Sequence, residues 1–410
     1  MSAERVVEHV TCLGCGCACD DIAAVVRQNR IVEARNACFL GRAWFGDGRV
    51  PQETRAGGRT VSLEAALTQA ATILTQARRP LVYLAVELSC ETQRAAVGIA
   101  DRLRAVLDSA TSEIAAAVLA AQRRGRATAT LGELRQRADL VVFWGVDPAE
   151  RYPRYASRYA VAAGGLHSRT VVAVDVGGHR GPGDADARVT ISADVEVDAL
   201  GVMRAIALGH PLPDVLALRP AVQLARRMMQ AQYVALVHDA EPDGTPADPD
   251  RAEGLIALAQ ALNGPTRCAL STLRAGGNRS GADAVVTWQT GFPCAVDFGR
   301  GYPSYRPHDG AAALVARREI DATLVIGSPG SVPERVARGL ASVPTVAIGP
   351  YASAAAFEPA VAVDTGVAGI HEGGMAFRMD DVPLPLRPSV AGPPVAAVVV
   401  RDLATRLVSP

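Results

Sequence analysis

Five of the eight cysteines lie within the first 38 residues, in a pattern suited to binding a metal. Four of them follow the spacing C-x2-C-x3-C-x18-C, namely Cys12, Cys15, Cys19 and Cys38. Thiolates are soft ligands, and three on one short loop with a fourth from farther along the chain suit an iron–sulfur cluster or a zinc ion. Glycines between the cysteines let the loop wrap closely around a metal. The spacing predicts one metal centre, with Cys17 as the spare thiol.

A disulfide framework is the alternative use of these thiols. We do not expect one, because the sequence opens with no apolar signal-peptide segment and the remaining cysteines, Cys90, Cys268 and Cys294, lie far apart. These three are expected to be buried core thiols.

The composition excludes several classes of function. Among the 410 residues, 42 basic residues balance 42 acidic ones, so no overall field indicates a nucleic acid or an anionic membrane as partner. All the basic residues are arginines, which excludes Schiff-base chemistry and a Walker lysine on this chain. No apolar run is long enough to span a membrane, so we expect a soluble, cytoplasmic protein.

The elements that would position such a centre alternate between helix and strand. A helical pattern covers residues 63–76, and further helices separate most of the apolar runs, which we interpret as buried strands at 80–85, 140–144, 170–174, 233–237, 285–288, 322–326 and 345–348. This alternation predicts an α/β protein with a small cysteine-rich segment and two doubly wound α/β domains.

The chain is expected to divide into four parts. We expect a cysteine-rich segment at 1–58, a discontinuous α/β domain at 59–110 and 231–390, an inserted α/β domain at 111–230, and a C-terminal helix and tail at 391–410.

Two further residues, Arg274 and His371, could take part in ligand binding or proton transfer. Arg274, before a glycine-rich stretch, could contact an anionic ligand or form a structural ion pair. His371 could act as a base, although no nucleophile lies near it in sequence and a loop role is the simpler interpretation. No Ser-His-Asp, Walker or HExxH arrangement is present, and we assign no catalytic residue.

The combined pattern resembles the B subunit of formylmethanofuran dehydrogenase, a member of the molybdopterin oxidoreductase superfamily. The resemblance extends over nearly the whole chain, and its anchors are the segments 12–22, 38–41, 137–148, 153–158, 288–293, 297–303 and 369–380. It implies a [4Fe-4S] cluster in the cysteine segment. It also implies two α/β domains on either side of a cleft that, in the dehydrogenase, holds tungsten or molybdenum on two pterin guanine dinucleotides.

Two departures from the dehydrogenase pattern bear on function. The dehydrogenase has a metal-ligating cysteine, followed by histidine, shortly after a segment like 105–108, whereas residues 109–117 here contain neither and place Ile114 near the ligand position. A Val-Asp-Pro-Arg run that often meets the pterin dinucleotide is replaced by residues 174–178, Val-Asp-Val-Gly-Gly. We therefore expect no molybdenum or tungsten pterin on this chain.

This combination resembles the B subunit of the bacterial formyltransferase/hydrolase complex, which transfers a formyl group from a tetrahydromethanopterin carrier to a methanofuran-like carrier and releases formate. The resemblance implies a non-redox structural subunit, with a formyltransferase, an amidohydrolase-like subunit and a small β-rich subunit as partners. An active tungsten- or molybdenum-dependent dehydrogenase subunit is the alternative. A zinc-binding interaction protein is a more remote third hypothesis.

Overall fold

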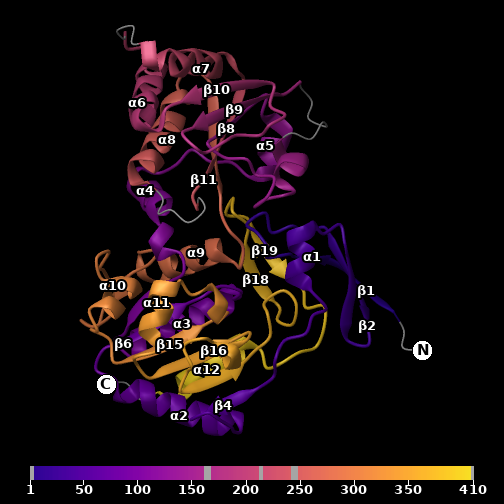
Figure 1. Ribbon diagram of the computed structural model, residues 1–410, viewed down its shortest axis with the longest axis vertical. Coiled ribbons are helices and arrows are strands. Elements are labelled where there is room, and N and C mark those ends of the chain that lie inside the picture. Colours follow the sequence, from indigo (N-terminus) through magenta and orange to yellow (C-terminus); the bar gives the residue numbers. More distant parts are fainter. Residues whose placement is uncertain (1–3, 161–167, 212–215, 242–247, 408–410) are drawn as a thin grey trace. The chain divides into compact units, whose positions relative to one another are not determined.

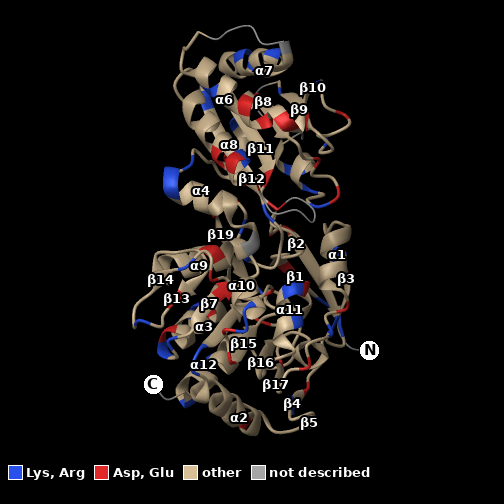
Figure 2. Cartoon of the chain, turned by 60° about the vertical axis from the view of Figure 1, so that its left-hand side comes forward, with Lys and Arg blue, Asp and Glu red and all other residues tan. Residues whose placement is uncertain are grey.

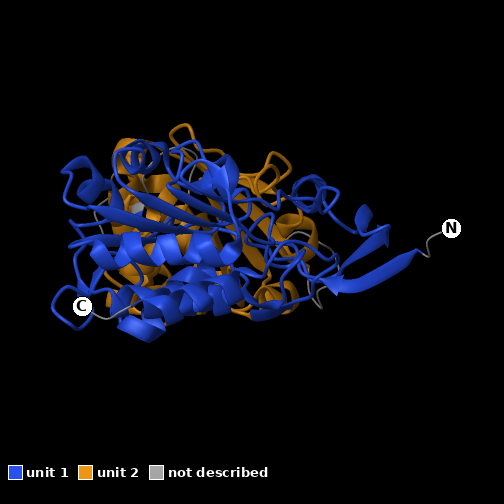
Figure 3. Ribbon diagram, turned by 90° about the horizontal axis from the view of Figure 1, so that it is seen from below, with its two compact units in different colours: residues 1–113, 276–378, 383–410 blue, residues 114–275, 379–382 orange. Residues whose placement is uncertain are grey.

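The computed structural model describes residues 4–160, 168–211, 216–241 and 248–407 (Figure 1). The chain forms two compact units, shown in different colours in Figure 3. Unit 1 comprises residues 1–113, 276–378 and 383–410, and unit 2 comprises residues 114–275 and 379–382. No helix in the described segments is long and apolar enough to cross a membrane. Figure 2 shows both signs of charge spread over the helices and loops of each unit, as the balanced composition predicts.

A small antiparallel sheet begins unit 1. Its strands are β1 (Arg5–Val10), β2 (Ile22–Arg27) and β3 (Arg30–Arg35), in the order β1-β2-β3, and the short helix α1 (Phe39–Phe45) follows. The central strand β2 is buried along residues 22–26, so both faces of this small sheet are covered there. The cysteine-rich loop lies between β1 and β2.

A nine-stranded mixed sheet forms the body of unit 1, in the order β14-β13-β7-β6-β15-β16-β17-β4-β5. Its five central strands are parallel: β7 (Val106–Ser109), β6 (Pro80–Leu84), β15 (Ala322–Ile326), β16 (Thr345–Gly349) and β17 (Val361–Asp364). The antiparallel edges are formed by β13 (Val296–Asp297), β14 (Ser304–Tyr305), β4 (Thr54–Ala56) and β5 (Arg59–Thr60). Strand order reverses between β6 and β15, which makes the carboxyl ends of these strands the expected ligand position.

Helices cover both faces of this sheet. Along β6, Val82 and Leu84 belong to one apolar cluster, which also includes residues of α2 (Leu63–Gln76), α3 (Cys90–Arg102), α9 (Arg279–Thr290) and α12 (Ala396–Arg406). Leu81 and Tyr83 belong to a second cluster, with α10 (Ala311–Ala316) and α11 (Glu334–Leu340). Burial on both faces explains why the strands are continuous apolar runs. A two-stranded ribbon of β18 (Gly374–Phe377) and β19 (Pro383–Leu386) completes unit 1.

Unit 2 is built on a five-stranded, fully parallel sheet in the order β10-β9-β8-β11-β12. Its strands are β8 (Leu140–Trp144), β9 (Thr170–Val176), β10 (Ala187–Ile191), β11 (Tyr233–Asp239) and β12 (Arg267–Leu273). Its helices are α4 (Ala116–Arg124), α5 (Leu131–Arg137), α6 (Glu196–Ala207), α7 (Arg219–Gln230) and α8 (Pro249–Leu262). The strand order reverses between β8 and β11, as in dinucleotide-binding folds.

Four sequence-based expectations differ from the structure. The cysteine-rich segment 1–58 is part of unit 1 rather than a domain of its own. The inserted unit continues to residue 275 rather than ending at 230, because β11 pairs in parallel register with β8 and cannot leave that sheet. The tail belongs to unit 1, since α12 contributes to its core. The prediction of a strand at 285–288 is wrong, because these residues lie inside α9. Val285 and Val286 are buried there and Trp288 is exposed. The coarser α/β class is confirmed.

Candidate metal centre

The cysteine loop is folded tightly back on itself. The backbone N–H of Cys12 donates to the carbonyl of Cys19 at 2.9 Å, and the N–H of Ala18 donates to the carbonyl of Cys15 at 3.1 Å. Ala18 has a φ of 38°, a left-handed conformation that residues with a Cβ adopt rarely. Such local strain is characteristic of segments shaped for a function.

Cys38 is brought back to this loop by α1, which begins at the next residue. A Cβ atom on Gly41 would lie 3.2 Å from the Cys12 sulfur and 3.9 Å from the Cys38 sulfur, so the missing side chain leaves room for both thiols. The backbone N–H of Gly14 is 3.4 Å from the Cys12 sulfur and donates to it. Hydrogen bonds of this kind favour a thiolate.

The four predicted ligands lie within electrostatic range of one another. Burial raises the pKa of the Cys12 thiol, and the hydrogen bond from Gly14 opposes that rise. The pKa of Cys12 rises further through repulsion by three neighbouring thiols, those of Cys15, Cys19 and Cys38. A bound metal cation would instead lower the pKa values of these thiols, because it stabilises the deprotonated ligands.

Cys17, the predicted spare thiol, is fully buried beside this group. A hydrogen bond with the Cys15 side chain, together with burial, raises the pKa of Cys17 well above its ordinary value. None of the eight cysteines forms a disulfide, so no S–S bond competes for the sulfur atoms. Within the described residues, no three His, Cys, Asp or Glu side chains are already arranged to hold a metal ion. Donor type and proximity therefore fit a metal, but a preset coordination shell is not found there.

The cysteine loop is anchored on the body of unit 1 by two glycines of the stretch that follows Arg274, Gly276 and Gly277. The N–H of Gly277 donates to the carbonyl of Leu13 at 2.8 Å. A Cβ on Gly276 would lie only 2.1 Å from that carbonyl oxygen, so the loop rests directly on glycine backbone. The sequence signal was the glycine pair itself, but its partner is more than 250 positions away along the chain.

An acidic residue missed by the sequence analysis stands beside this anchor. Glu87 follows β6 with a left-handed φ of 70°, and its N–H donates to the carbonyl of Gly277 at 2.9 Å. Burial raises the pKa of the Glu87 carboxyl group, while the neighbouring Ser328 and Trp44 side chains oppose the rise. Ser328 follows β15, so these contacts join the two strands at which the sheet order reverses.

The remaining candidate residues have structural partners. The Nε of Arg274 lies 2.7 Å from Oε1 of Glu241 in a buried ion pair, which favours the structural role. The Nε2 atom of His371 is 2.8 Å from the carbonyl of Gly48, and its Nδ1 accepts a hydrogen bond from the N–H of Val367 at 3.0 Å. Burial lowers the pKa of His371, so the ring is a neutral link between loops rather than a base.

The three later cysteines are buried, as expected. Burial raises the pKa of Cys90 to about 11 and that of Cys268 to about 12. The pKa of Cys294 is raised by burial and by the neighbouring Asp108 and Asp283. None has the lowered pKa that marks a reactive thiolate.

The segment in which the resemblance implies a metal-ligating cysteine has hydroxyl groups that bond to each other and to a nearby carboxylate. The Thr111 hydroxyl donates to Oδ1 of Asp283 at 2.6 Å and lies 2.8 Å from the Ser109 hydroxyl. Ile114 ends the short 3-10 turn that follows and offers no ligand atom.

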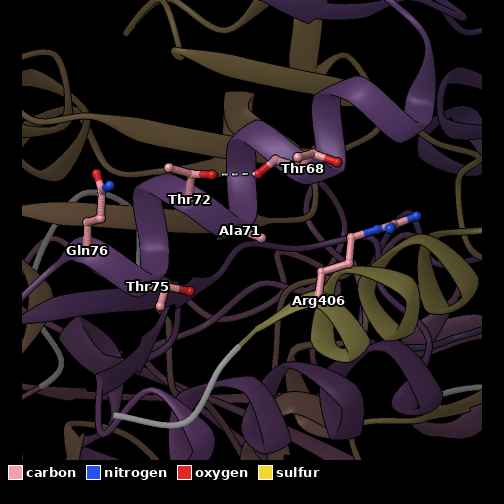
Figure 4. A pocket seen from close by; sticks show the side chains of 6 residues that line it. All are labelled: Thr68, Ala71, Thr72, Thr75, Gln76 and Arg406. Atoms are coloured by element: carbon pink, nitrogen blue, oxygen red, sulfur yellow. Dashed lines mark hydrogen bonds between the residues drawn. The ribbon is translucent and has the colours of Figure 1, made fainter.

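A separate hollow lies between α2 and α12 and is lined by Thr68, Ala71, Thr72, Thr75, Gln76 and Arg406 (Figure 4). The Thr72 hydroxyl donates to the Thr68 carbonyl at 3.0 Å, and the Thr68 hydroxyl donates to the Glu64 carbonyl at 2.9 Å. These hydroxyls are therefore engaged with their own helix, and the hollow presents no paired acid and base.

Comparison with known proteins connects this geometry to two groups of relatives. No protein-family model matches the chain. The B subunit of the tungsten-containing formylmethanofuran dehydrogenase 2 of Methanocaldococcus jannaschii is 32% identical over 97% of each chain. The protein of that name from Methanococcus maripaludis is 28% identical over 95% of each chain.

The second group comes from a bacterium. The B subunit of the formyltransferase/hydrolase complex Fhc of Methylorubrum extorquens is 32% identical over 66% of this chain and 73% of its own length. A chain from the crystal structure of the FhcABCD complex of that organism, solved with methylofuran, superposes with a TM-score of 0.73 at 27% identity. This match covers 86% of the present chain and 98% of the other.

Proposed function

The chain belongs to the family of formylmethanofuran dehydrogenase B subunits, and we propose that within this family it is the non-redox structural subunit of a formyltransferase/hydrolase complex. Such a complex would act in one-carbon metabolism that uses tetrahydromethanopterin and methanofuran-like carriers, and would release the formyl group as formate. In this proposal the transfer and hydrolysis steps belong to other subunits. The present chain contributes the α/β scaffold.

One observation carries the proposal. Residues 109–117, which begin at the last residue of β7, contain neither cysteine nor histidine, and the Thr111 hydroxyl already bonds to the Ser109 hydroxyl and to Asp283. Tungsten or molybdenum in such a site needs a soft or anionic protein ligand. At the position of that ligand, Ile114 and the alanines after it supply none, and the nearby Asp283 carboxylate already accepts a hydrogen bond from Thr111.

The cysteine segment supports a metal centre of a different kind. Cys12, Cys15, Cys19 and Cys38 would hold a [4Fe-4S] cluster or a zinc ion. Either group would cross-link the β1–β2 loop to α1 and so stabilise the N-terminal part of unit 1. An iron–sulfur cluster would supply one-electron chemistry, which the proposed function does not require.

The proposed partners are a formyltransferase subunit, an amidohydrolase-like subunit and a small β-rich subunit. The related Fhc protein belongs to a complex of several subunits, FhcABCD, which supports an assembly for this chain as well. The experiment is affinity purification from the native host through a tag on this chain, followed by mass spectrometry. We expect the three partners in stoichiometric amounts. A chain that elutes as a monodisperse monomer without them would contradict the proposal.

An active dehydrogenase subunit is the second candidate, favoured by the matches to tungsten-containing dehydrogenase subunits over nearly the whole chain. It predicts formate-dependent reduction of a redox dye by the purified complex. Our proposal predicts none.

A further inference from the structure

The carboxyl edge of the unit 2 sheet is the second place at which this fold would bind a ligand. Strand order reverses between β8 and β11, and dinucleotides bind at such reversals. The family resemblance implies a pterin guanine dinucleotide over an edge of this kind. The contacts at the ends of β8 and β9 decide whether a pterin guanine dinucleotide fits there.

The turn after β8 is already filled by a side chain. Gly145 follows Trp144 with a φ of 58°, and a Cβ placed on it would lie 2.5 Å from Nη2 of Arg251. The guanidinium therefore rests against the backbone of the turn where a phosphate would approach. Arg251 is held in the first turn of α8, whose N-cap residue Asp248 accepts a hydrogen bond from the Arg251 N–H at 3.4 Å.

A buried carboxylate neutralises this guanidinium. Nε of Arg251 lies 2.7 Å from Oε1 of Glu196, and the side chains are 14% and 10% exposed respectively. The same carboxylate oxygen accepts a hydrogen bond at 2.7 Å from the indole N–H of Trp144, the last residue of β8. Glu196 thus supplies, from within the chain, the anion that a bound phosphate would otherwise supply. This chain of contacts joins α8, α6 and β8.

The end of β9 is closed in a similar way. In dinucleotide-binding folds an acidic residue near this position bonds the ribose hydroxyls. Here one oxygen of Asp175 accepts from Arg188 at 2.6 Å and from the N–H of Gly181 at 2.9 Å, and the other accepts from Arg180 at 3.0 Å. A Cβ on Gly181 would lie 2.6 Å from the Cβ of Ala173, so the loop is pressed onto the strand itself.

We infer that the Arg251–Glu196 pair is an internal plug that takes the place of the dinucleotide phosphate in unit 2, so that this edge of the sheet does not accept a pterin guanine dinucleotide. The inference rests on the proposed non-redox function and gives a structural reason for it that is independent of the ligand position near Ile114. The opposite interpretation is that Arg251 receives a phosphate, since its Nε and Nη2 atoms are both buried without a hydrogen-bond partner among the described residues, and Nε meets Glu196 as an ion pair only.

Thermal unfolding of the full chain with and without GDP separates the two interpretations, because GDP has the guanine and pyrophosphate groups of the dinucleotide. We expect millimolar GDP to leave the Tm of the wild-type chain unchanged. Arg251→Met should lower Tm by roughly 5–10 °C, since it leaves the Glu196 carboxylate buried and unpaired. The double variant Arg251→Met/Glu196→Gln should recover part of that loss, and Arg226→Met, at an exposed position of α7, should change little.

Two results would overturn the plug. One is a GDP-dependent rise in the wild-type Tm that Arg251→Met abolishes, which would make Arg251 an anion receptor. The other is an Arg251→Met variant as stable as the wild type, which would show that the pair does not hold the edge closed. Neither result bears on copurification with partner subunits, so failure of this inference is distinguishable from failure of the proposed function.

Discussion

The two parallel sheets of this chain end in different ways at the point where their strand order reverses. In unit 1 the backbone of Glu87, after β6, bonds to Gly277, and the backbone of Gly277 bonds in turn to Leu13 in the cysteine loop. In unit 2 the carboxylates near the ends of β8 and β9, those of Glu196 and Asp175, are paired with arginines of the same unit. The first edge lies beside thiols, for which we propose a metal, and the second pairs its carboxylates with arginines of the same unit. A fold can therefore keep part of a cofactor site while filling another part with its own side chains.

The largest expected effect comes from removing one thiol of the cysteine loop. Cys19→Ala should abolish metal binding, because three thiolates remain of the four that the proposed centre needs. Cys17→Ala is the matched control, since Cys17 is equally buried but lies outside the ligand set. Iron and zinc content of both anaerobically purified variants is the measurement. Metal lost from Cys17→Ala and kept by Cys19→Ala would show that the ligand assignment is wrong.

The anchor of the thiol loop gives the next largest effect. Gly276→Ala places a Cβ 2.1 Å from the Leu13 carbonyl oxygen, so the loop must move away from unit 1. We expect the free energy of unfolding to fall by at least about 3 kcal/mol, measured by urea denaturation. Metal content should fall as well, because the loop carries three of the proposed ligands. A fully stable Gly276→Ala variant would mean that the loop is not docked as described.

The filled edge of unit 2 should be sensitive to acid. Burial, with added repulsion from Arg251 and Arg126, lowers the pKa of His238 from 6.5 to about 3, and its Nε2 lies 3.0 Å from the Thr272 hydroxyl. The unfolded chain takes up a proton near pH 6.5 that the folded chain does not take up. Stability is therefore complete above pH 6.5 and is lost as the pH falls toward 3.

The size of this effect can be checked directly. The His238 contribution lost between pH 7.5 and pH 4.5 should be about 2–3 kcal/mol. Because other groups also titrate, the measurement is the difference in unfolding free energy between wild type and His238→Gln at both pH values. If that difference is the same at both, His238 does not stay neutral in the folded state.

The smallest effect is a control for the glycine argument. Gly98 lies at an exposed position within α3, and a Cβ there would meet nothing within 4 Å. Gly98→Ala should raise the free energy of unfolding by roughly 0.5–1 kcal/mol through helix propensity alone. A loss of stability comparable to that of Gly276→Ala would show that the contrast between the two glycines does not depend on space around the Cβ.

Local patterns predicted much of the fold. The runs at 80–84, 140–144 and 322–326 are strands, because residues buried on both faces of a parallel sheet must be apolar without interruption. The same rule failed at Val285 and Val286, since a short apolar run can also be the buried side of a helix. The extent of unit 2 could not be predicted, because the pairing of β11 with β8 joins strands far apart in sequence.

The candidate site was predictable only in part. The structure brings the thiols of Cys12, Cys15, Cys19 and Cys38 into electrostatic range, while the metal itself stays a prediction. The docking of Leu13 on Gly276 and the burial of Glu87 depend on contacts between distant segments. Pairing of Asp175 with Arg180 and Arg188 is local, but an Asp followed by glycines fits a ligand loop equally well.

The central claim is that this family member is a non-redox subunit whose metal, if retained, is held by the cysteine loop alone. The most direct test is elemental analysis of the complex, purified anaerobically through this chain, for tungsten, molybdenum, iron and zinc. Our account predicts no tungsten or molybdenum, with about four irons or one zinc per copy of this chain. Stoichiometric tungsten or molybdenum bound to this subunit would contradict it.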